Sequence, residues 1–145
     1  MQPLDLTFRP PRGPREKLAG VCFMPRTIDK LRAEMPGGTI GKYINPEVGV
    51  SNYMCKRIGI PMEELRAIVA AAADEQEIEA WLNARLDPVV VEEANRKLET
   101  LSTERLSPEN LAIVKGYHPV MEHRPELVNY FEIFEADDAA TYPDP

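Results

Sequence analysis

The sequence predicts a mainly α-helical protein. Apolar side chains recur three and four residues apart through most of the chain, and proline, glycine and capping residues mark where these segments begin and end. A hydrophobic content of 43% together with 28% charged residues is typical of a soluble globular protein. We therefore expect a single compact multi-helix domain over residues 13–136, preceded by an extended arm (1–12) and followed by a frayed acidic tail (137–145).

The arm is expected to be extended because Pro10 and Pro11 disfavour helix in the residues before them. Leu4, Leu6 and Phe8 alternate along it, so we expect all three side chains to lie on the domain. Exchange of such an arm between two copies is a low-cost route to a homodimer.

The first helix is expected over residues 13–35. Pro14 suits the first helical position, where its missing N–H is not needed. One apolar stripe at helical spacing is formed by Leu18, Val21, Ile28, Leu31 and Met35. Pro25 lies inside this segment and predicts a kink or a break there, because it removes a backbone hydrogen bond.

The opposite face of this helix carries the candidate site. At about 100° per residue, Arg15, Cys22, Arg26 and Asp29 fall within an arc of about 60°, with Lys30 beside them. Two guanidinium groups could hold a carboxylate or phosphate while an acidic side chain orients one of them. The candidate ligand-binding residues are Arg12, Arg15, Arg26, Asp29, Lys30 and Tyr43.

The same face has a simpler interpretation. Charged side chains on one side of a surface helix are usually solvated, with weak pairs such as Arg26–Asp29 and Lys30–Glu34. The two arginines on the arc would lower the pKa of Cys22 and favour its thiolate, but a small, partly buried apolar role is the alternative for that cysteine.

The remaining motifs predict further helices and no metal site. Helices are expected over 50–58 up to Gly59, from Pro61, after the capping pair Asp74 and Glu77, over 89–102, from Ser107 to Gly116, and over the aromatic segment 127–136. The two histidines, His118 and His123, lack the spacing of a metal-binding helix, so neither a metal nor another cofactor is expected.

Charge is unevenly distributed along the chain. Residues 1–32 carry a net charge of +4 and residues 33–145 a net charge of −11, which gives −7 overall. An acidic protein of this kind is not expected to bind nucleic acid, but its basic N-terminal segment can dock on the acidic remainder or form a local anion site. No apolar run approaches the length of a membrane span and no signal peptide is recognisable, so a cytoplasmic location is expected.

The N-terminal segment also resembles a known signature. Residues 11–20 read Pro-Arg-Gly-Pro-Arg-Glu-Lys-Leu-Ala-Gly, and residues 25–30 read Pro-Arg-Thr-Ile-Asp-Lys. This is similar to a bacterial family catalogued only as a domain of unknown function, whose members usually read Pro-Arg-Ser-Pro-Arg-Glu-x-Leu-Gly-Gly and then Arg-x-x-Asp-Lys. The resemblance implies a small, mainly helical fold and emphasises Arg15, Arg26, Asp29 and Lys30, but it implies no activity.

Three functions remain open from the sequence. The first is a non-catalytic binding or interaction module that recognises a small anionic ligand or an acidic protein partner. The second is a small enzyme acting on a phosphate- or carboxylate-bearing metabolite, with Asp29 or Cys22 in the chemistry. The third is a structural homo-oligomer joined by the 89–102 helix and the arm. No catalytic triad or dinucleotide-binding motif supports an enzyme, so the binding module ranks first.

Overall fold

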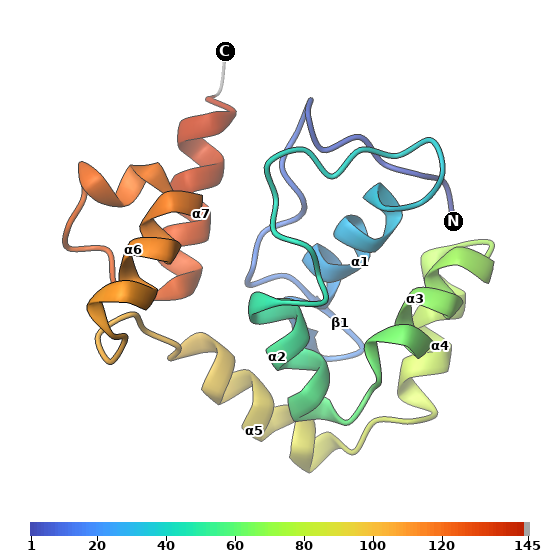
Figure 1. Ribbon diagram of the computed structural model, residues 1–145. Helices are drawn as coiled ribbons and strands as arrows, with labels where there is room; N and C mark the ends of the chain where they lie inside the picture. Colours follow the sequence, from blue (N-terminus) through green and yellow to red (C-terminus); the bar gives the residue numbers. More distant parts are fainter. Residues whose placement is uncertain (144–145) are drawn as a thin grey trace. The chain divides into compact units, whose positions relative to one another are not determined.

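The computed structural model describes residues 1–143 and confirms a mainly α-helical fold (Figure 1). The chain divides into two compact units, Met1–Leu98 and Glu99–Pro145. The expectation of one domain over residues 13–136 stays a prediction.

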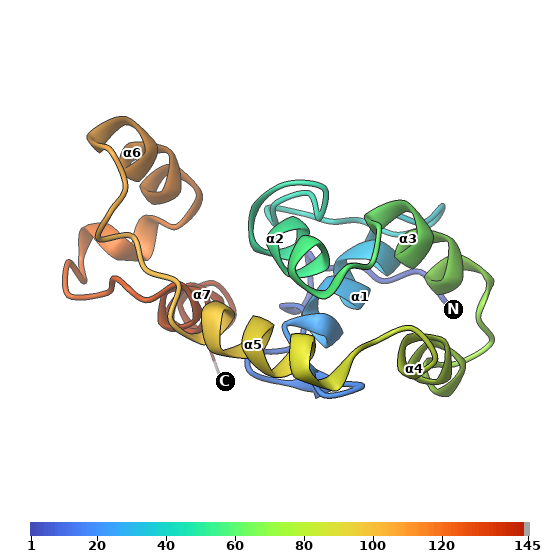
Figure 2. The same cartoon turned by 90° about the horizontal axis from the view of Figure 1, so that it is seen from below.

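The first unit contains a small hairpin and five helices. Its elements are β1 (Lys17–Leu18), β2 (Val21–Cys22), α1 (Met24–Ala33), α2 (Gly49–Ile58), α3 (Met62–Ala71), α4 (Glu75–Asn83) and α5 (Pro88–Glu99), which ends at the border of the unit. Helix α1 contacts α2, α3 and β1, and nine of its ten residues are buried. Figures 1 and 2 show α2 and α3 on either side of it. This burial makes α1 the central helix of the unit.

The predicted helix over residues 13–35 is wrong in its first half. Lys17 pairs with Cys22, and Leu18 with Val21, in an antiparallel hairpin whose turn residues, Ala19 and Gly20, both have positive φ. The helix begins only at Met24, so that Pro25 stands in its first turn rather than in its interior. Proline is tolerated at this position, because the first helical N–H groups have no partner within the helix. Proline in this case marks a helix start and not a kink.

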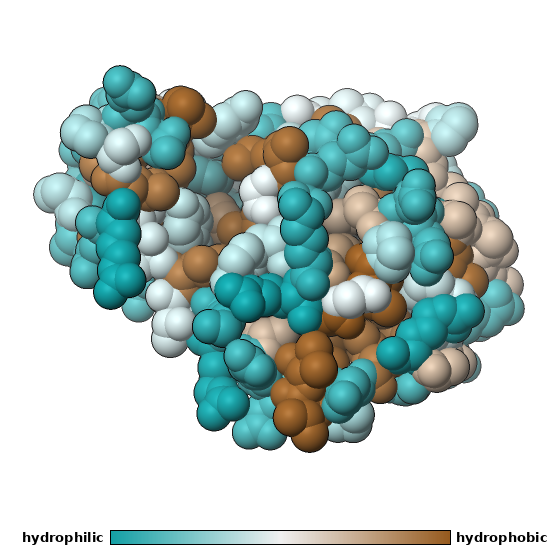
Figure 3. All heavy atoms as spheres, turned by 60° about the horizontal axis from the view of Figure 1, so that its bottom comes forward, coloured by the Kyte–Doolittle hydropathy of each residue, from teal (hydrophilic) through white to brown (hydrophobic). Residues whose placement is uncertain are grey.

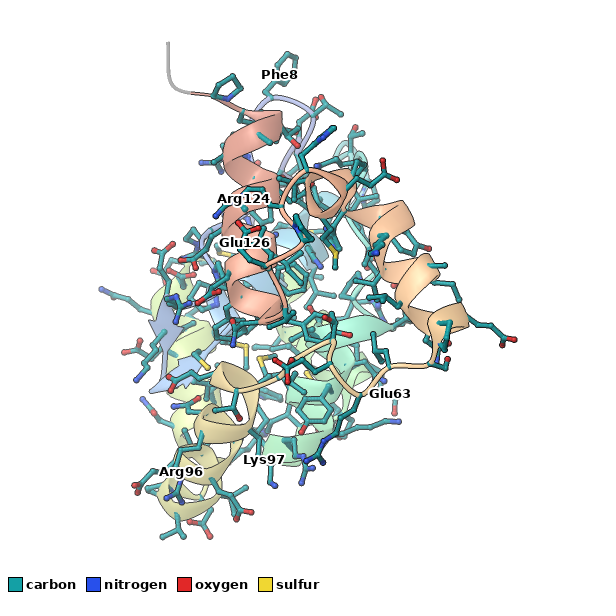
Figure 4. The ribbon with its side chains drawn as sticks, turned by 90° about the vertical axis from the view of Figure 1, so that its left-hand side faces the viewer. Phe8, Glu63, Arg96, Lys97, Arg124 and Glu126 are labelled. Carbon is teal, nitrogen blue, oxygen red and sulfur yellow. The ribbon has the colours of Figure 1, made fainter. Side chains whose placement is uncertain are left out.

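The extended arm is tied to the first unit by backbone hydrogen bonds. The amide of Leu6 donates to the carbonyl of Thr39 (2.8 Å), and the amide of Thr39 donates to the carbonyl of Leu4 (2.9 Å). Leu6 is fully buried, as expected. Phe8, in contrast, is 82% exposed and projects from the fold (Figure 4), which corrects the expectation that it packs on the domain. The chain turns over residues 6–9 and breaks the alternation on which that expectation depended.

Two helix boundaries were predictable from their capping residues. Gly59 ends α2 in the left-handed conformation (φ 76°), which glycine adopts at little cost. Asp74 caps α4 by accepting from the amide of Glu77 (3.0 Å), while the carboxylate of Glu77 accepts from the amide of Ala73 (3.0 Å). This reciprocal pair confirms the predicted capping signature.

The second unit contains α6 (Pro108–Tyr117), the short 3-10 helix η1 (Pro119–Glu122) and α7 (Tyr130–Thr141). Helix α7 covers most of the aromatic segment, as predicted, and it buries Phe131, Ile133 and Phe134. The expected tail is corrected, because α7 continues through Thr141 and buries Asp137, which lies 3.3 Å from the imidazole of His118. Of the predicted tail, residues 144–145 lie outside the described part of the chain.

The surface carries a few large exposed apolar side chains. Val89 (74% exposed) and Val90 (39%) stand in the first turn of α5. Figure 3 shows hydrophobic surface at the lower edge of its view. Over residues 1–143, no helix combines the length and the hydropathy that spanning a membrane requires.

Candidate functional site

An ionic network joins the arm to two helices of the first unit. The guanidinium of Arg12 donates to both carboxylate oxygens of Asp29, through Nη2 at 3.0 Å and Nε at 3.2 Å. The backbone amide of Arg12 also donates to Asp29 (2.8 Å). Two further bonds run from the same guanidinium to Glu75, the first residue of α4, at 2.6 and 3.1 Å. The network therefore fixes the arm against α1 and α4 at one point.

The network holds Arg12 firmly in its charged form. Burial by itself lowers the pKa of this guanidinium, because a charged group loses solvation there. The hydrogen bonds to Glu75 and Asp29 outweigh that effect, and their negative charges add to it, so that the pKa of Arg12 is raised. Arg12 acts as a permanent cation between two carboxylates.

Two more cations of α1 lie against aromatic rings. Arg26 is only 2% exposed, and its guanidinium lies 5.9 Å from the ring centre of Phe23 and 5.5 Å from that of Tyr43. Lys30 is 7% exposed, and its ammonium lies 5.9 Å from the same Phe23 ring. Nη1 of Arg26 also donates to the backbone carbonyl of Arg12 (3.2 Å), which links this group to the ionic network. Cations over aromatic faces are stabilised by the ring quadrupole.

We call this assembly the α1 cluster. It consists of Arg12, Phe23, Arg26, Asp29, Lys30, Tyr43 and Glu75. Five of the six predicted site residues are in it. Arg15 is not: its side chain is exposed on the segment before β1, because the predicted helical arc does not exist there.

The interpretation of a solvated helix face is wrong. Arg26, Asp29 and Lys30 are all less than 10% exposed. Asp29 accepts from Arg12 (3.0 Å), and Glu34 pairs with Arg66 (3.4 Å). These three residues of α1 therefore belong to the interior, whereas the side chains of Arg12 and Glu75 at the edge of the cluster are 32% and 33% exposed.

Sequence reasoning missed Phe23 and Glu75. Phe23 directly precedes α1 in a left-handed conformation (φ 70°), which its sequence context does not predict. Glu75 directly follows the capping residue Asp74, so its place at the start of a helix was predictable, but its pairing with Arg12 across 63 positions was not.

The candidate nucleophile Cys22 lies on β2 with no solvent exposure, and its backbone amide donates to the side-chain oxygen of Asn95 (3.1 Å). Cys55 is also buried, and burial raises the pKa of its thiol to about 12. Within the described residues, no three His, Cys, Asp or Glu side chains are grouped so that they could hold a metal ion.

The fold and the site define a mainly α-helical protein in which the central helix of the first unit carries a largely buried cluster of cations, carboxylates and aromatic rings. The chain belongs to the family described as Domain of unknown function (DUF5069), whose model matches residues 8–140. No curated protein matches the chain. The expected membership of a family of unknown function is confirmed, while the proposed N-terminal motif and the bacterial origin stay predictions.

Proposed function

We propose that this protein is a non-catalytic binding module whose α1 cluster recognises a carboxylate or phosphate group. The observation that carries this proposal is the placement of Arg26 and Lys30, one helical turn apart, against the same Phe23 ring. Guanidinium and ammonium groups are the two side-chain cations that proteins use for these anions.

The burial of Arg26 and Lys30 would strengthen their attraction for an anion. At exposures of 2% and 7%, Arg26 and Lys30 interact with any nearby charge through a medium less polar than water. An anion bound beside these two cations would be attracted by both of them. Such an anion would be bound more strongly than on an exposed basic surface, where solvent and salt screen the attraction.

The neighbouring residues suit a positioning role. Asp29 is engaged by Arg12, so that this guanidinium offsets the negative charge of Asp29 beside the proposed anion. Tyr43 comes from the loop that joins α1 to α2 and lies over Arg26. Movement of that loop would give a ligand access to the cluster, and the phenol hydroxyl would supply a further hydrogen bond donor.

The enzyme alternative gains no support from the arrangement of its candidate residues. The carboxylate of Asp29 already accepts four hydrogen bonds from Arg12 at 2.8 to 3.3 Å. Cys22 is buried in the hairpin and belongs to no helical arc with the arginines. The oligomer alternative based on the 89–102 segment is not favoured either, because Val91, Ala94 and Leu98 are buried within the chain.

The test is a thermal-shift titration at low salt with inorganic phosphate, pyrophosphate, dicarboxylates and a short acidic peptide. An anion present at 100 times its dissociation constant adds about 2.7 kcal/mol to stability, which raises Tm by roughly 8 °C in a protein of this size. A response to small anions alone indicates a metabolite site, whereas a response to the peptide alone indicates an acidic protein partner.

Two variants make the test specific. Lys30→Met keeps the length of the side chain and removes its charge, so it should abolish most of the shift. Arg32→Gln is the control, because Arg32 is on the same helix but donates to the backbone of Gln2 outside the cluster. The proposal fails if no anion changes Tm, or if folded Lys30→Met responds like the wild type.

A further inference from the structure

Helix α6 is unusual among the described helices because it buries none of its residues. Every other α-helix buries at least two, and even the short η1 buries Met121. A ten-residue helix is marginal in water by its own propensity and owes its stability to packing of an apolar face. Among the described helices and strands, α6 packs mainly against η1, and the other side of α6 is open.

The open side of α6 is partly apolar. Glu109, Ile113 and Tyr117 are four residues apart and therefore share one face of the helix. Ile113 is 59% exposed and Tyr117 is 51% exposed. Leu111 and Val114, on the other side, are half-buried. The open face thus presents an acid followed by two large side chains over about 12 Å of helix.

A groove of matching character lies on the first unit. It has a volume of about 510 Å³ and is lined by Glu64, Ala67, Ile68, Ala71, Trp81 and Arg85. Ala67 and Ala71 are one turn apart on α3, and their small side chains permit close approach of another helix. Ile68 and Trp81 supply apolar surface on which a large side chain such as Ile113 can pack.

A fixed cation completes the groove. The guanidinium of Arg85 lies 4.1 Å from the ring centre of Trp81, and its Nη1 donates to the carbonyl of Trp81 (2.9 Å). These two contacts hold the positive charge beside the apolar floor. Glu109, on the open face of α6, has the complementary charge.

We propose that α6 of one chain binds in the α3–α4 groove of a second copy and that the protein forms a homodimer by reciprocal exchange of this contact. Ile113 and Tyr117 would cover the apolar floor, and Glu109 would pair with Arg85. A second copy is favoured because a two-fold dimer contains the contact twice. One short helix in a shallow groove buries little area compared with the roughly 1,200–2,000 Å² of a stable interface. This inference is independent of the anion site.

Sedimentation velocity of the full-length protein, from low to high micromolar concentration, tests the assembly. The wild type should show a reversible monomer–dimer equilibrium. Ile113→Asp should weaken dimerisation by roughly 100- to 10,000-fold, because the two-fold dimer loses this large apolar side chain from both of its contacts. Val89→Asp is the matched control, since Val89 is 74% exposed but lies outside the groove. It should dimerise like the wild type.

Charge reversal and fluorescence test the pairing itself. Arg85→Glu and Glu109→Arg should each weaken the dimer, and the double variant should restore it. Trp81 is the only tryptophan of the chain, so its emission should shift to the blue as the groove is occupied.

Three results would overturn the proposal. The first is a wild type that is monomeric at every concentration. If the Trp81 emission of that monomer is blue-shifted and Ile113→Asp removes the shift, α6 occupies the groove of its own chain. The second is a dimer whose dissociation constant is the same in Ile113→Asp as in the wild type. The third is an Arg85→Glu, Glu109→Arg double variant that dimerises as weakly as the folded single variants.

Discussion

Asp29 is the residue on which the α1 cluster depends most directly. It is 4% exposed and accepts hydrogen bonds from both the backbone and the side chain of Arg12. Burying a carboxylate costs desolvation free energy, which is offset only while a partner compensates its charge. Removing that charge would leave the Arg12 guanidinium bonded to Glu75 and to the backbone carbonyl of Pro25, and would loosen the arm.

Asp29→Asn should therefore destabilise the protein. We expect a loss of about 2 kcal/mol in the free energy of unfolding, at the lower end for a buried pair because Arg12 is itself 32% exposed. Urea denaturation followed by circular dichroism measures the change. The control is Glu126→Gln, in the exposed Arg124–Glu126 pair visible in Figure 4, which should leave stability unaltered. Equal stability of Asp29→Asn and the wild type would show that the network is not structural.

Cys55 should be inert in the folded protein. Burial raises the pKa of its thiol to about 12, and the residue is 2% exposed. At pH 8 its thiolate fraction is then about 10⁻⁴, against roughly a quarter at the ordinary pKa of about 8.5, so alkylation should be about 10³-fold slower than in the unfolded chain. Iodoacetamide labelling with peptide mass spectrometry, in buffer and in urea, measures both rates. Comparable rates in the two conditions would mean that the thiol is accessible.

Individual residues of the candidate site were predictable, but their surroundings were not. The charges of Arg26, Asp29 and Lys30 are evident in the sequence at helical spacing, and the structure places them together on α1. Their burial depends on long-range partners such as Tyr43 and Glu75, and no local pattern encodes those contacts.

Helix boundaries show at the next scale which local signals are reliable. Gly59, Asp74 and Ser107 all mark boundaries that the sequence predicted, because each acts through bonds to residues within the adjacent turn. Residues 13–23 were misassigned because apolar spacing in a short hairpin mimics a helical stripe. The turn at Ala19 requires a positive φ (51°) that a non-glycine residue rarely adopts, so no local residue pattern predicted it.

Two glycines make a paired prediction about these elements. A Cβ at Gly38 would lie 2.6 Å from the backbone oxygen of Ala33 and 2.9 Å from that of Arg32, so Gly38→Ala should cost about 1–3 kcal/mol by forcing the end of α1 apart. A Cβ at Gly116 meets nothing within 4 Å, and Gly116 is inside α6. Gly116→Ala should stabilise the protein by up to about 1 kcal/mol. Thermal unfolding should show a lower Tm for Gly38→Ala and a higher Tm for Gly116→Ala than for the wild type. A lower Tm for Gly116→Ala would contradict the open surroundings of α6.

At the scale of the whole molecule, stability is expected to be graded between the elements of the two units. Helix α1 buries nine of its ten residues, whereas α6 buries none. Helices with few buried contacts open locally at low free energy, and those at the centre of a core exchange only when their unit unfolds. The fold thus combines a rigid helix bearing the charged cluster with a helix whose own contacts hold it weakly.

Amide hydrogen exchange measured at two protein concentrations tests this gradient together with the proposed dimer. In dilute solution, the amides of α6 should exchange first and those of α1 last, because opening of α6 breaks few packing contacts. At high concentration, docking of α6 in the groove of a second copy should slow exchange in α6 and in α3, and leave α1 unaltered. Ile113→Asp should remove this concentration dependence while preserving the gradient of the dilute sample. Protection of α6 that is high and independent of concentration would contradict both the gradient and the dimer, since it would require a partner for α6 within its own chain.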